Sequence, residues 1–303
     1  TFKVDTVAPV LSKTSPIDWA NVIKPNVVIT AVEATSGLDG TTTNFTLVGS
    51  VTGNIAGSGS WSGLVYTFVP TNDLNENETY TATMDVDDKA GNSATQLSFT
   101  FEVDVHAPTI DNLAPADDTW VTTATPPISA QVHSEGGGSG IDATTIVMKV
   151  DGVAVAHDYS VPPTVSFTPA GLGEGTHTVT VDVSDAAGNA ATQASWTFKV
   201  DTIKPTLSGT PMGWATVIKP DVVITAVETG SGMNTGVGAF TLSGNISGDI
   251  TALGSGSWNG LVYTFIPGPD LNEGETYTAT MANAADVAGN VADTLTFTFQ
   301  VDV

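Results

Sequence analysis

A four-residue motif, Phe-x-Val-Asp, recurs along the 303-residue chain and divides it into units of similar length. The motif ends at Asp5, Asp104, Asp201 and Asp302, so that it returns every 97 to 101 residues. A spacing near 100 residues is too long for one repeat of a solenoid and is the size of an independent domain. The sequence therefore predicts three domains in tandem, at 6–104, 105–201 and 202–303. Residues 1–5 repeat the end of a unit, and we interpret them as the terminal strand of a preceding repeat or as a donor strand.

The first and third units are near copies of each other. VIKPNVVITAVE at 22–33 returns as VIKPDVVITAVE at 217–228, and GSGSWSGLVYTFVP at 57–70 returns as GSGSWNGLVYTFIP at 254–267. The middle unit keeps the spacing of the turns but differs from the other two in most of its residues. This pattern predicts one shared fold for all three units.

Apolar residues alternate with polar ones within each unit, with a period of two. In the first unit Leu97, Phe99 and Phe101 alternate with Ser98 and Thr100. Gly, Pro, Asn and Asp interrupt such runs every eight to twelve residues. About seven short strands in about 100 residues are typical of an Ig-like β-sandwich. We therefore predict an all-β protein, built of three tandem Ig-like β-sandwiches in an extended rod with no long helix.

A tyrosine near the end of each outer unit supports this fold. Tyr80 follows Leu74 by six residues, and Tyr277 follows Leu271 by the same number. This spacing predicts a tyrosine corner, in which the hydroxyl bonds back to the preceding turn. His177 holds the same place in the middle unit, where a ring nitrogen could do the same.

Several motifs of the units resemble those of bacterial Ig-like domains. They include VDTVAPVLSKTSP at the start of a unit, SGLD or SGID after the second strand, LNEGETYTATM, and DVAGN near the end. The first and third units are similar to repeats of S-layer proteins, and the middle unit is similar to repeats of giant surface adhesins. The resemblance implies a secreted or cell-surface location. It also implies a role in stalks, fibres, surface layers or accessory modules.

Composition excludes several partners. The formal net charge is −24, and all eight basic residues are lysines. Nucleic-acid binding needs a basic surface, so it is not expected. No apolar run is long enough to span a bilayer, so membrane insertion is not expected either. The absence of cysteine excludes disulfides and thiolate chemistry, whereas the acidic balance suits a cation.

The motif DxAGN lies between the last two strands of each unit, at 88–92, 185–189 and 286–290. In an Ig-like sandwich this loop and the loop after the second strand lie at the end that receives the previous unit. We therefore predict that acids and amides converge there as Ca²⁺ sites, because Ca²⁺ prefers oxygen ligands. The candidates are Asp5, Glu33, Asp39, Asp88 and Asn92 in unit one, Asp104, Glu135, Asp142, Asp185 and Asn189 at the first junction, and Asp201, Glu228, Asp286 and Asn290 at the second. The alternative is that these residues only form turns and carry solvated charges.

The tryptophans have two interpretations. Trp196 belongs to an alternating strand, and Trp61 and Trp258 occupy matching positions, so we predict that all three pack between strands. Trp19 and Trp214 lie after the first strand, where an exposed ring could stack on a glycan.

No catalytic residue recurs between units. The four histidines occupy unrelated positions, and the chain has no GxSxG, P-loop or GxGxxG motif. We therefore predict a non-catalytic structural segment of a secreted or surface protein, stiffened by Ca²⁺ at the junctions, whose partners are neighbouring Ig-like repeats or copies of itself. Two alternatives stay open: a module that binds carbohydrate or another partner, and a filament subunit joined by β-strand augmentation.

Overall fold

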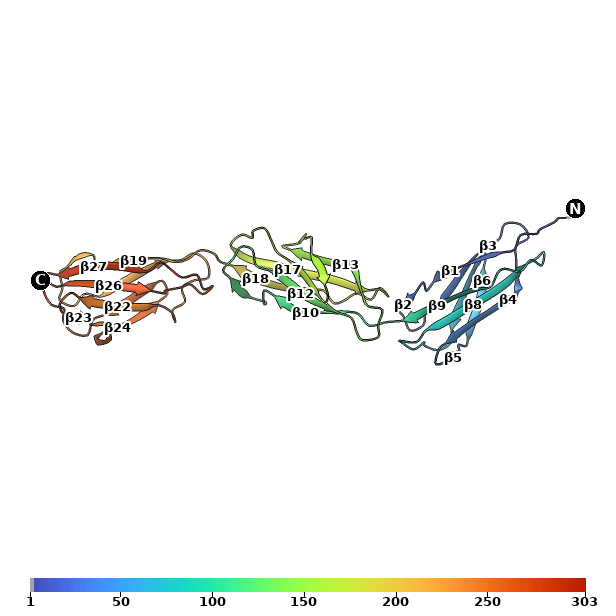
Figure 1. The fold of residues 1–303 in the computed structure, drawn as a ribbon, viewed down its shortest axis with the longest axis horizontal. Coiled ribbons are helices and arrows are strands. Elements are labelled where there is room, and N and C mark those ends of the chain that lie inside the picture. Colours follow the sequence, from blue (N-terminus) through green and yellow to red (C-terminus); the bar gives the residue numbers. More distant parts are fainter. Residues whose placement is uncertain (1–2) are drawn as a thin grey trace.

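Residues 3–303 are described by a computed structural model, which is all-β. Three β-sandwiches follow one another in a row, with the first and the third at opposite ends (Figure 1). The only helical element among residues 3–303 is the single 3-10 turn η1 (Thr251–Leu253). The predicted fold, three tandem Ig-like sandwiches in an extended arrangement, is confirmed.

Each unit consists of a four-stranded and a five-stranded sheet. In unit one the four-stranded sheet has the order β1 (Val10–Ser15), β3 (Val27–Val32), β7 (Val65–Pro70), β6 (Gly57–Ser62). The five-stranded sheet has the order β2 (Trp19–Ala20), β9 (Leu97–Val103), β8 (Tyr80–Asp88), β4 (Leu38–Gly49), β5 (Gly53–Asn54).

Units two and three repeat this strand order. The sheets of unit two are β10 (Thr109–Ala114), β12 (Ile128–His133), β16 (Thr164–Phe167), β15 (Asp158–Val161), and β11 (Thr119–Val121), β18 (Ala194–Val200), β17 (Gly175–Asp185), β13 (Ile141–Val150), β14 (Val153–Ala154). The sheets of unit three are β19 (Thr206–Thr210), β21 (Val222–Val227), β25 (Val262–Ile266), β24 (Ser255–Asn259), and β20 (Gly213–Ala215), β27 (Leu295–Val301), β26 (Thr276–Ala282), β22 (Ala239–Gly244), β23 (Gly248–Asp249).

Each sandwich has its own core, formed by the apolar face of both sheets. Phe99 and Phe101 of β9 are buried, while Ser98 and Thr100 between them face solvent. This alternation follows from the pleat, which sends successive side chains to opposite faces of a sheet. Trp196 is buried as predicted.

Trp61 and Trp258 lie between strands, as predicted. The Trp61 indole lies 5.4 Å from the Tyr66 ring and donates a hydrogen bond of 2.8 Å to the Thr43 hydroxyl. Trp258 lies 5.5 Å from the ring of Tyr263.

The first strand of every unit is split between the two sheets. In unit one, β1 pairs antiparallel with β3, and then β2 pairs parallel with β9 of the other sheet. The same split places β11 beside β18 and β20 beside β27. As a result, one tryptophan per unit stands on this short strand: Trp19 opposite Glu102, Trp120 opposite Lys199, and Trp214 opposite Gln300.

The predicted tyrosine corners are present in both outer units. The Asn75 N–H donates to the Tyr80 hydroxyl oxygen at 2.7 Å, and the Asn272 N–H donates to that of Tyr277 at the same distance. In unit two a nitrogen of His177 lies 2.9 Å from the Gly173 carbonyl oxygen, and the other lies 2.8 Å from a carboxylate oxygen of Asp151. His177 therefore replaces the tyrosine, as predicted.

The corner of unit two gives that unit its own dependence on pH. Burial lowers the pKa of His177, but the bonds to Asp151 and to the Gly173 carbonyl raise it by more, so that the net pKa lies above its ordinary value. A raised histidine pKa stabilises the fold below the unfolded pKa, and this contribution is lost as pH rises through the folded pKa. We expect the melting temperature of unit two to fall as pH rises above about 6.5, the ordinary pKa of histidine.

Thermal melts across that rise in pH test this expectation, with His177→Gln as the control. Glutamine keeps a hydrogen-bonding side chain but does not titrate, so the variant should lose the alkaline decline. An equal decline in parent and variant would assign the effect to another group.

Candidate metal clusters and the domain junctions

At each of the two internal junctions, the aspartate that ends the Phe-x-Val-Asp motif is bonded to two units at once. At the first junction the Asp104 N–H donates to the Ala20 carbonyl of unit one at 2.9 Å. Its own carbonyl accepts from the Asn189 amide of unit two at 2.8 Å, and its carboxylate accepts from the Ser139 N–H at 2.6 Å. We call this arrangement of aspartate, asparagine amide and serine N–H the linker clamp.

The second junction has the same linker clamp. The Asp201 N–H donates to the Val121 carbonyl of unit two at 3.0 Å. Its carbonyl accepts from the Asn290 amide, and its carboxylate accepts from the Ser231 N–H, both at 2.8 Å. Asp104 and Asp201 are buried, so these bonds are shielded from solvent.

Asp5 makes the bonds of a linker clamp with unit one. Its carbonyl accepts from the Asn92 amide at 3.2 Å, and its carboxylate accepts from the Ser36 N–H at 2.9 Å and the Val7 N–H at 3.1 Å. Residues 3–5 lie outside any strand, and residues 1 and 2 of the proposed terminal strand lie outside the described residues.

The DxAGN loop presents the asparagine of the linker clamp. In unit two, Asp185 accepts from the backbone N–H and from the side-chain amide of Asn189, both at 2.8 Å. The loop reverses at Gly188, whose φ of 93° lies in the left-handed region that favours glycine. The motif therefore forms a tight turn, and this turn orients the amide that bonds the neighbouring linker.

Two groups of three carboxylates lie close enough to share one metal ion. Among residues 3–303 they are Asp5, Glu33 and Asp88, and Asp201, Glu228 and Asp286, and in each group one oxygen of every member lies within 4.8 Å of the others. Each group combines the linker aspartate with one acid from each of the two predicted loops.

The second group holds an oxygen without a hydrogen-bond partner. Glu228 Oε2 is buried and accepts no bond from the described residues, while Asp201 and Asp286 are almost fully buried. Burial raises the pKa of Glu228, the Gly230 N–H partly opposes this, and the charges of Asp201 and Asp286 raise it further. Crowded carboxylates with a free oxygen fit a hard cation such as Ca²⁺.

The first junction differs from the second. Glu135 is the acid of the corresponding loop, but it stands one residue further from its strand than Glu33 and Glu228 do. It lies 3.8 Å from His106 Nδ1, and Glu76 of unit one lies 3.0 Å from the same nitrogen. Among the described residues, Asp104, Glu135 and Asp185 do not form a three-carboxylate group. Two signs of this difference were visible in the sequence: the loop of unit two is two residues longer between its strand and Ser139, and His106 stands where Val7 and Ile203 stand.

Asp39 and Asp142 lie outside both groups and belong to local turns. Asp39 accepts from the Thr41 N–H at 3.0 Å and from its hydroxyl at 2.6 Å, and Asp142 makes the same two bonds with Thr144. The bonds from the Thr41 hydroxyl and N–H hold the pKa of Asp39 below its usual value.

Two kinds of functional residue were missed by the sequence analysis. The serines of the linker clamp, Ser36, Ser139 and Ser231, each precede a glycine at the same place in their units, and this repetition could have revealed them. The buried acids Glu78 and Glu275 stand two residues before the corner tyrosines. Their repetition was visible, but their burial was not.

Family profiles described as bacterial Ig-like domains match residues 5–103, residues 106–202 and, for a group 3 profile, residues 162–301. A search of curated proteins found no significant match. The fibronectin(III)-like modules of CbhA from Clostridium thermocellum are 16% identical, cover 63% of this chain and 94% of their own, and give a TM-score of 0.43. A structure entitled for host cell surface retention of a 1.5-MDa bacterial ice-binding adhesin is 17% identical, covers 97% of both chains, and gives a TM-score of 0.38.

No helix among residues 3–303 has the length and apolarity needed to cross a bilayer. The three profile matches together span residues 5–301: the first two coincide with units one and two, and the third covers unit three together with the second half of unit two. All three units are sandwiches of one strand order. The chain is a tandem array of three bacterial Ig-like domains.

Proposed function

We propose that this chain is a non-catalytic spacer of a secreted or cell-surface protein, which holds its units in a defined line. The linker clamp is the observation that carries this proposal. At both internal junctions one buried aspartate donates to the preceding unit and accepts from the following one. A linker whose polar groups are bonded on both sides loses the freedom of an ordinary flexible linker.

Further contacts between linker and unit support stiffness at each junction. The Glu174 carboxylate of unit two accepts from the Thr202 N–H at 3.0 Å and from its hydroxyl. At the first junction, His106 of the linker lies between Glu76 and Glu135, as described above. Removal of the Asn–Asp bond should therefore loosen a junction without unfolding a unit.

We expect Asn189→Ala to reduce the maximum dimension of the chain in small-angle X-ray scattering. Strands of about ten residues make each unit roughly 35–45 Å long, so the stiff parent should extend to roughly 110–130 Å. Asn92→Ala is the matched control, because Asn92 makes the same bonds in unit one but joins no two of the three units. In each variant, the free energy of unfolding of the unit that carries the substitution should fall by about 1 kcal/mol.

The proposal requires that only the junction variant shortens the rod. If Asn189→Ala and Asn92→Ala scatter alike, then the linker clamp does not control how the units are held.

We propose in addition that Ca²⁺ binds the two three-carboxylate groups. The free Glu228 Oε2 and the buried carboxylates beside it support this, because a divalent cation would offset their mutual repulsion. Affinities of about 10⁻⁴ to 10⁻³ M are usual for extracellular modules. Saturation at about 100 times Kd would stabilise the folded state by about 2.7 kcal/mol.

The variant Glu228→Gln tests this site, because we expect Ca²⁺ to reverse which protein, parent or variant, has the higher melting temperature. In chelator, we expect the variant to melt above the parent, because the substitution removes one of three crowded negative charges. In excess Ca²⁺ we expect the parent to melt higher, because it alone keeps the full set of ligands. Glu135→Gln at the first junction is the matched control and should show no reversal. If excess Ca²⁺ leaves the parent's melting temperature unchanged, the Ca²⁺ site is contradicted. The junctions are then held by the linker clamp without a metal ion.

A further inference from the structure

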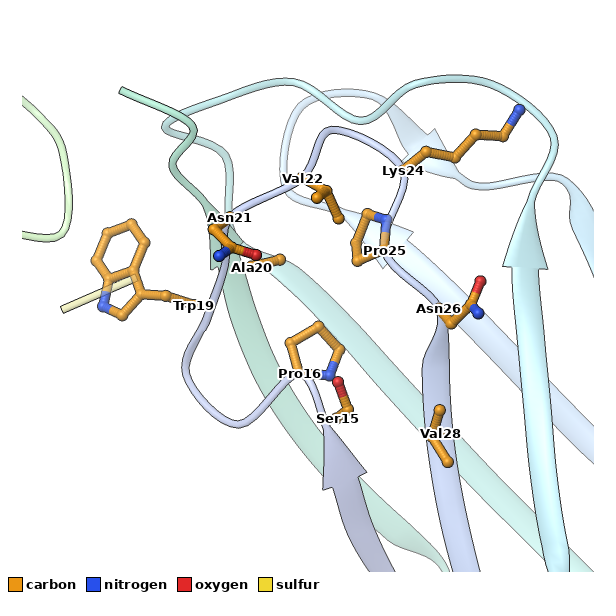
Figure 2. Close-up of a pocket in the computed structure, with 10 residues that line it drawn as sticks. All are labelled: Ser15, Pro16, Trp19, Ala20, Asn21, Val22, Lys24, Pro25, Asn26 and Val28. Atoms are coloured by element: carbon orange, nitrogen blue, oxygen red, sulfur yellow. The ribbon is translucent and has the colours of Figure 1, made fainter. Parts of the chain in front are cut away.

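A cavity of about 460 Å³ lies beside Trp19 at the end of unit one that faces unit two. Its size falls within the usual range of small-ligand sites. Figure 2 shows Pro16, Val22 and Pro25 converging as its apolar part, while the Trp19 ring projects at one side and Asn26 lies at the other. Of the residues that line it, Ala20 alone takes part in the linker clamp, through its carbonyl.

We propose that this cavity is a binding site for a neutral oligosaccharide. A sugar ring has an apolar face, which stacks on an aromatic ring, and an edge of hydroxyl groups, which both donate and accept hydrogen bonds. Trp19 supplies the flat ring, and Asn21 and Asn26 supply amides that can donate and accept. This inference is independent of the proposed spacer function.

The position of Trp19 is fixed by backbone pairing. Strand β2 pairs parallel with β9, which places Trp19 opposite Glu102 and leaves the indole only partly buried. A ligand that stacks on Trp19 therefore has to order only the two torsions of its side chain, so more of the contact energy appears as affinity.

The charges around the cavity favour a neutral ligand. The only charged residue in its lining is Lys24, whose ammonium group donates to the Thr71 carbonyl at 2.6 Å. The chain as a whole carries a net charge of −24, which repels anionic polymers. A proline-rich peptide would need a groove with several aromatic rings, and this lining contains one.

The cavity also reaches the neighbouring unit. A side-chain carbon at Gly188 of unit two would lie 3.6 Å from Asn21 Nδ2, so this amide lies against the DxAGN loop of that unit. A ligand held by Asn21 would therefore sit where the two units meet.

Unit three supplies a natural comparison. Trp214 stands in the place of Trp19 and is 62% exposed, but Thr216 replaces Asn21 and Asp221 replaces Asn26. Unit three thus keeps the platform and lacks both amides, which makes Trp214→Ala the matched control.

The test is calorimetric titration of the full chain with four hexasaccharides: β-1,4-linked glucose, xylose and N-acetylglucosamine, and α-1,4-linked glucose. We expect saturable binding of at least one of them, weakened at least tenfold by Trp19→Ala and severalfold by Asn26→Asp, and unchanged by Trp214→Ala. Asn26→Asp gives unit one the residue of unit three, and it provides a result even if Trp19→Ala fails to fold.

The proposal is overturned if none of the four sugars shows saturable binding to the chain. It is equally overturned if folded Trp19→Ala binds as the parent does, or if a proline-rich decapeptide binds at this cavity while the sugars do not.

Discussion

Replacement of Glu275 by glutamine is expected to destabilise unit three by roughly 3 kcal/mol, because a buried charged acceptor with several donors is lost. One oxygen of Glu275 accepts from the N–H groups of Ile246 and Ser247 at 2.8 and 2.6 Å. The other accepts from the hydroxyl of Tyr277 and the amide of Asn272, both at 2.9 Å. Glutamine keeps the shape but turns one acceptor into a donor that faces other donors.

Glu275 and its counterpart Glu78 should make the two outer units sensitive to acid. Burial raises the pKa of Glu275, but hydrogen bonds from Ser247, Asn272 and Ile246 lower it by more, to about 2, from an ordinary value of 4.5. Glu78 of unit one also has its pKa lowered to about 2, because N–H bonds from Thr52 and Val51 outweigh its burial. A lowered carboxyl pKa stabilises the fold above the unfolded value, and this contribution is lost as pH falls from about 4.5 towards about 2.

Chemical unfolding at neutral pH and at about pH 3 measures both the loss of stability in Glu275→Gln and the loss of stability of the parent in acid. Glu273→Gln is the control, because Glu273 is an exposed acid two residues away. We expect the Glu275→Gln variant to lose stability at neutral pH and to depend less on pH than the parent. A loss as small as that of Glu273→Gln would mean that the corner does not need the charge.

Replacement of Gly256 by valine is expected to destabilise unit three by about 1–3 kcal/mol, the usual cost of overpacking. Gly256 lies on the edge strand β24, and the ring of Tyr263 from β25 lies where a side chain at Gly256 would stand. In the same way, the ring of Phe265 covers Gly254. Unit one repeats the arrangement with Tyr66 over Gly59 and Phe68 over Gly57.

Thermal melts of Gly256→Val and of the control Ser257→Val test this. Ser257 is the next residue on the same strand, and its side chain is exposed. Valine there should be neutral or slightly stabilising, because valine favours strands. Equal effects at the two positions would show that Tyr263 moves aside without cost.

Most of the fold followed from local patterns in the sequence. Alternation with a period of two, as in Leu97–Val103, predicts strands with one buried face wherever it occurs. The Phe-x-Val-Asp spacing gave the number of units, and the Leu–Tyr spacing predicted the corners at Tyr80 and Tyr277. The GSGSW motif was recognised as a repeat. Its glycines are explained only by the structure, because aromatic rings of the neighbouring strand lie over them.

The residues of the candidate sites were predicted from the sequence, but the contacts between them were not. The sequence by itself determined which acids and amides each unit carries in its junction loops, because the units are copies of one pattern. Only the tertiary structure decided which of them meet. Glu228 lies beside Asp201 and Asp286, whereas its counterpart Glu135 lies beside His106. The reason is that each of these contacts joins a loop of one unit to a linker, and a local sequence pattern does not set the distance between segments that are far apart along the chain.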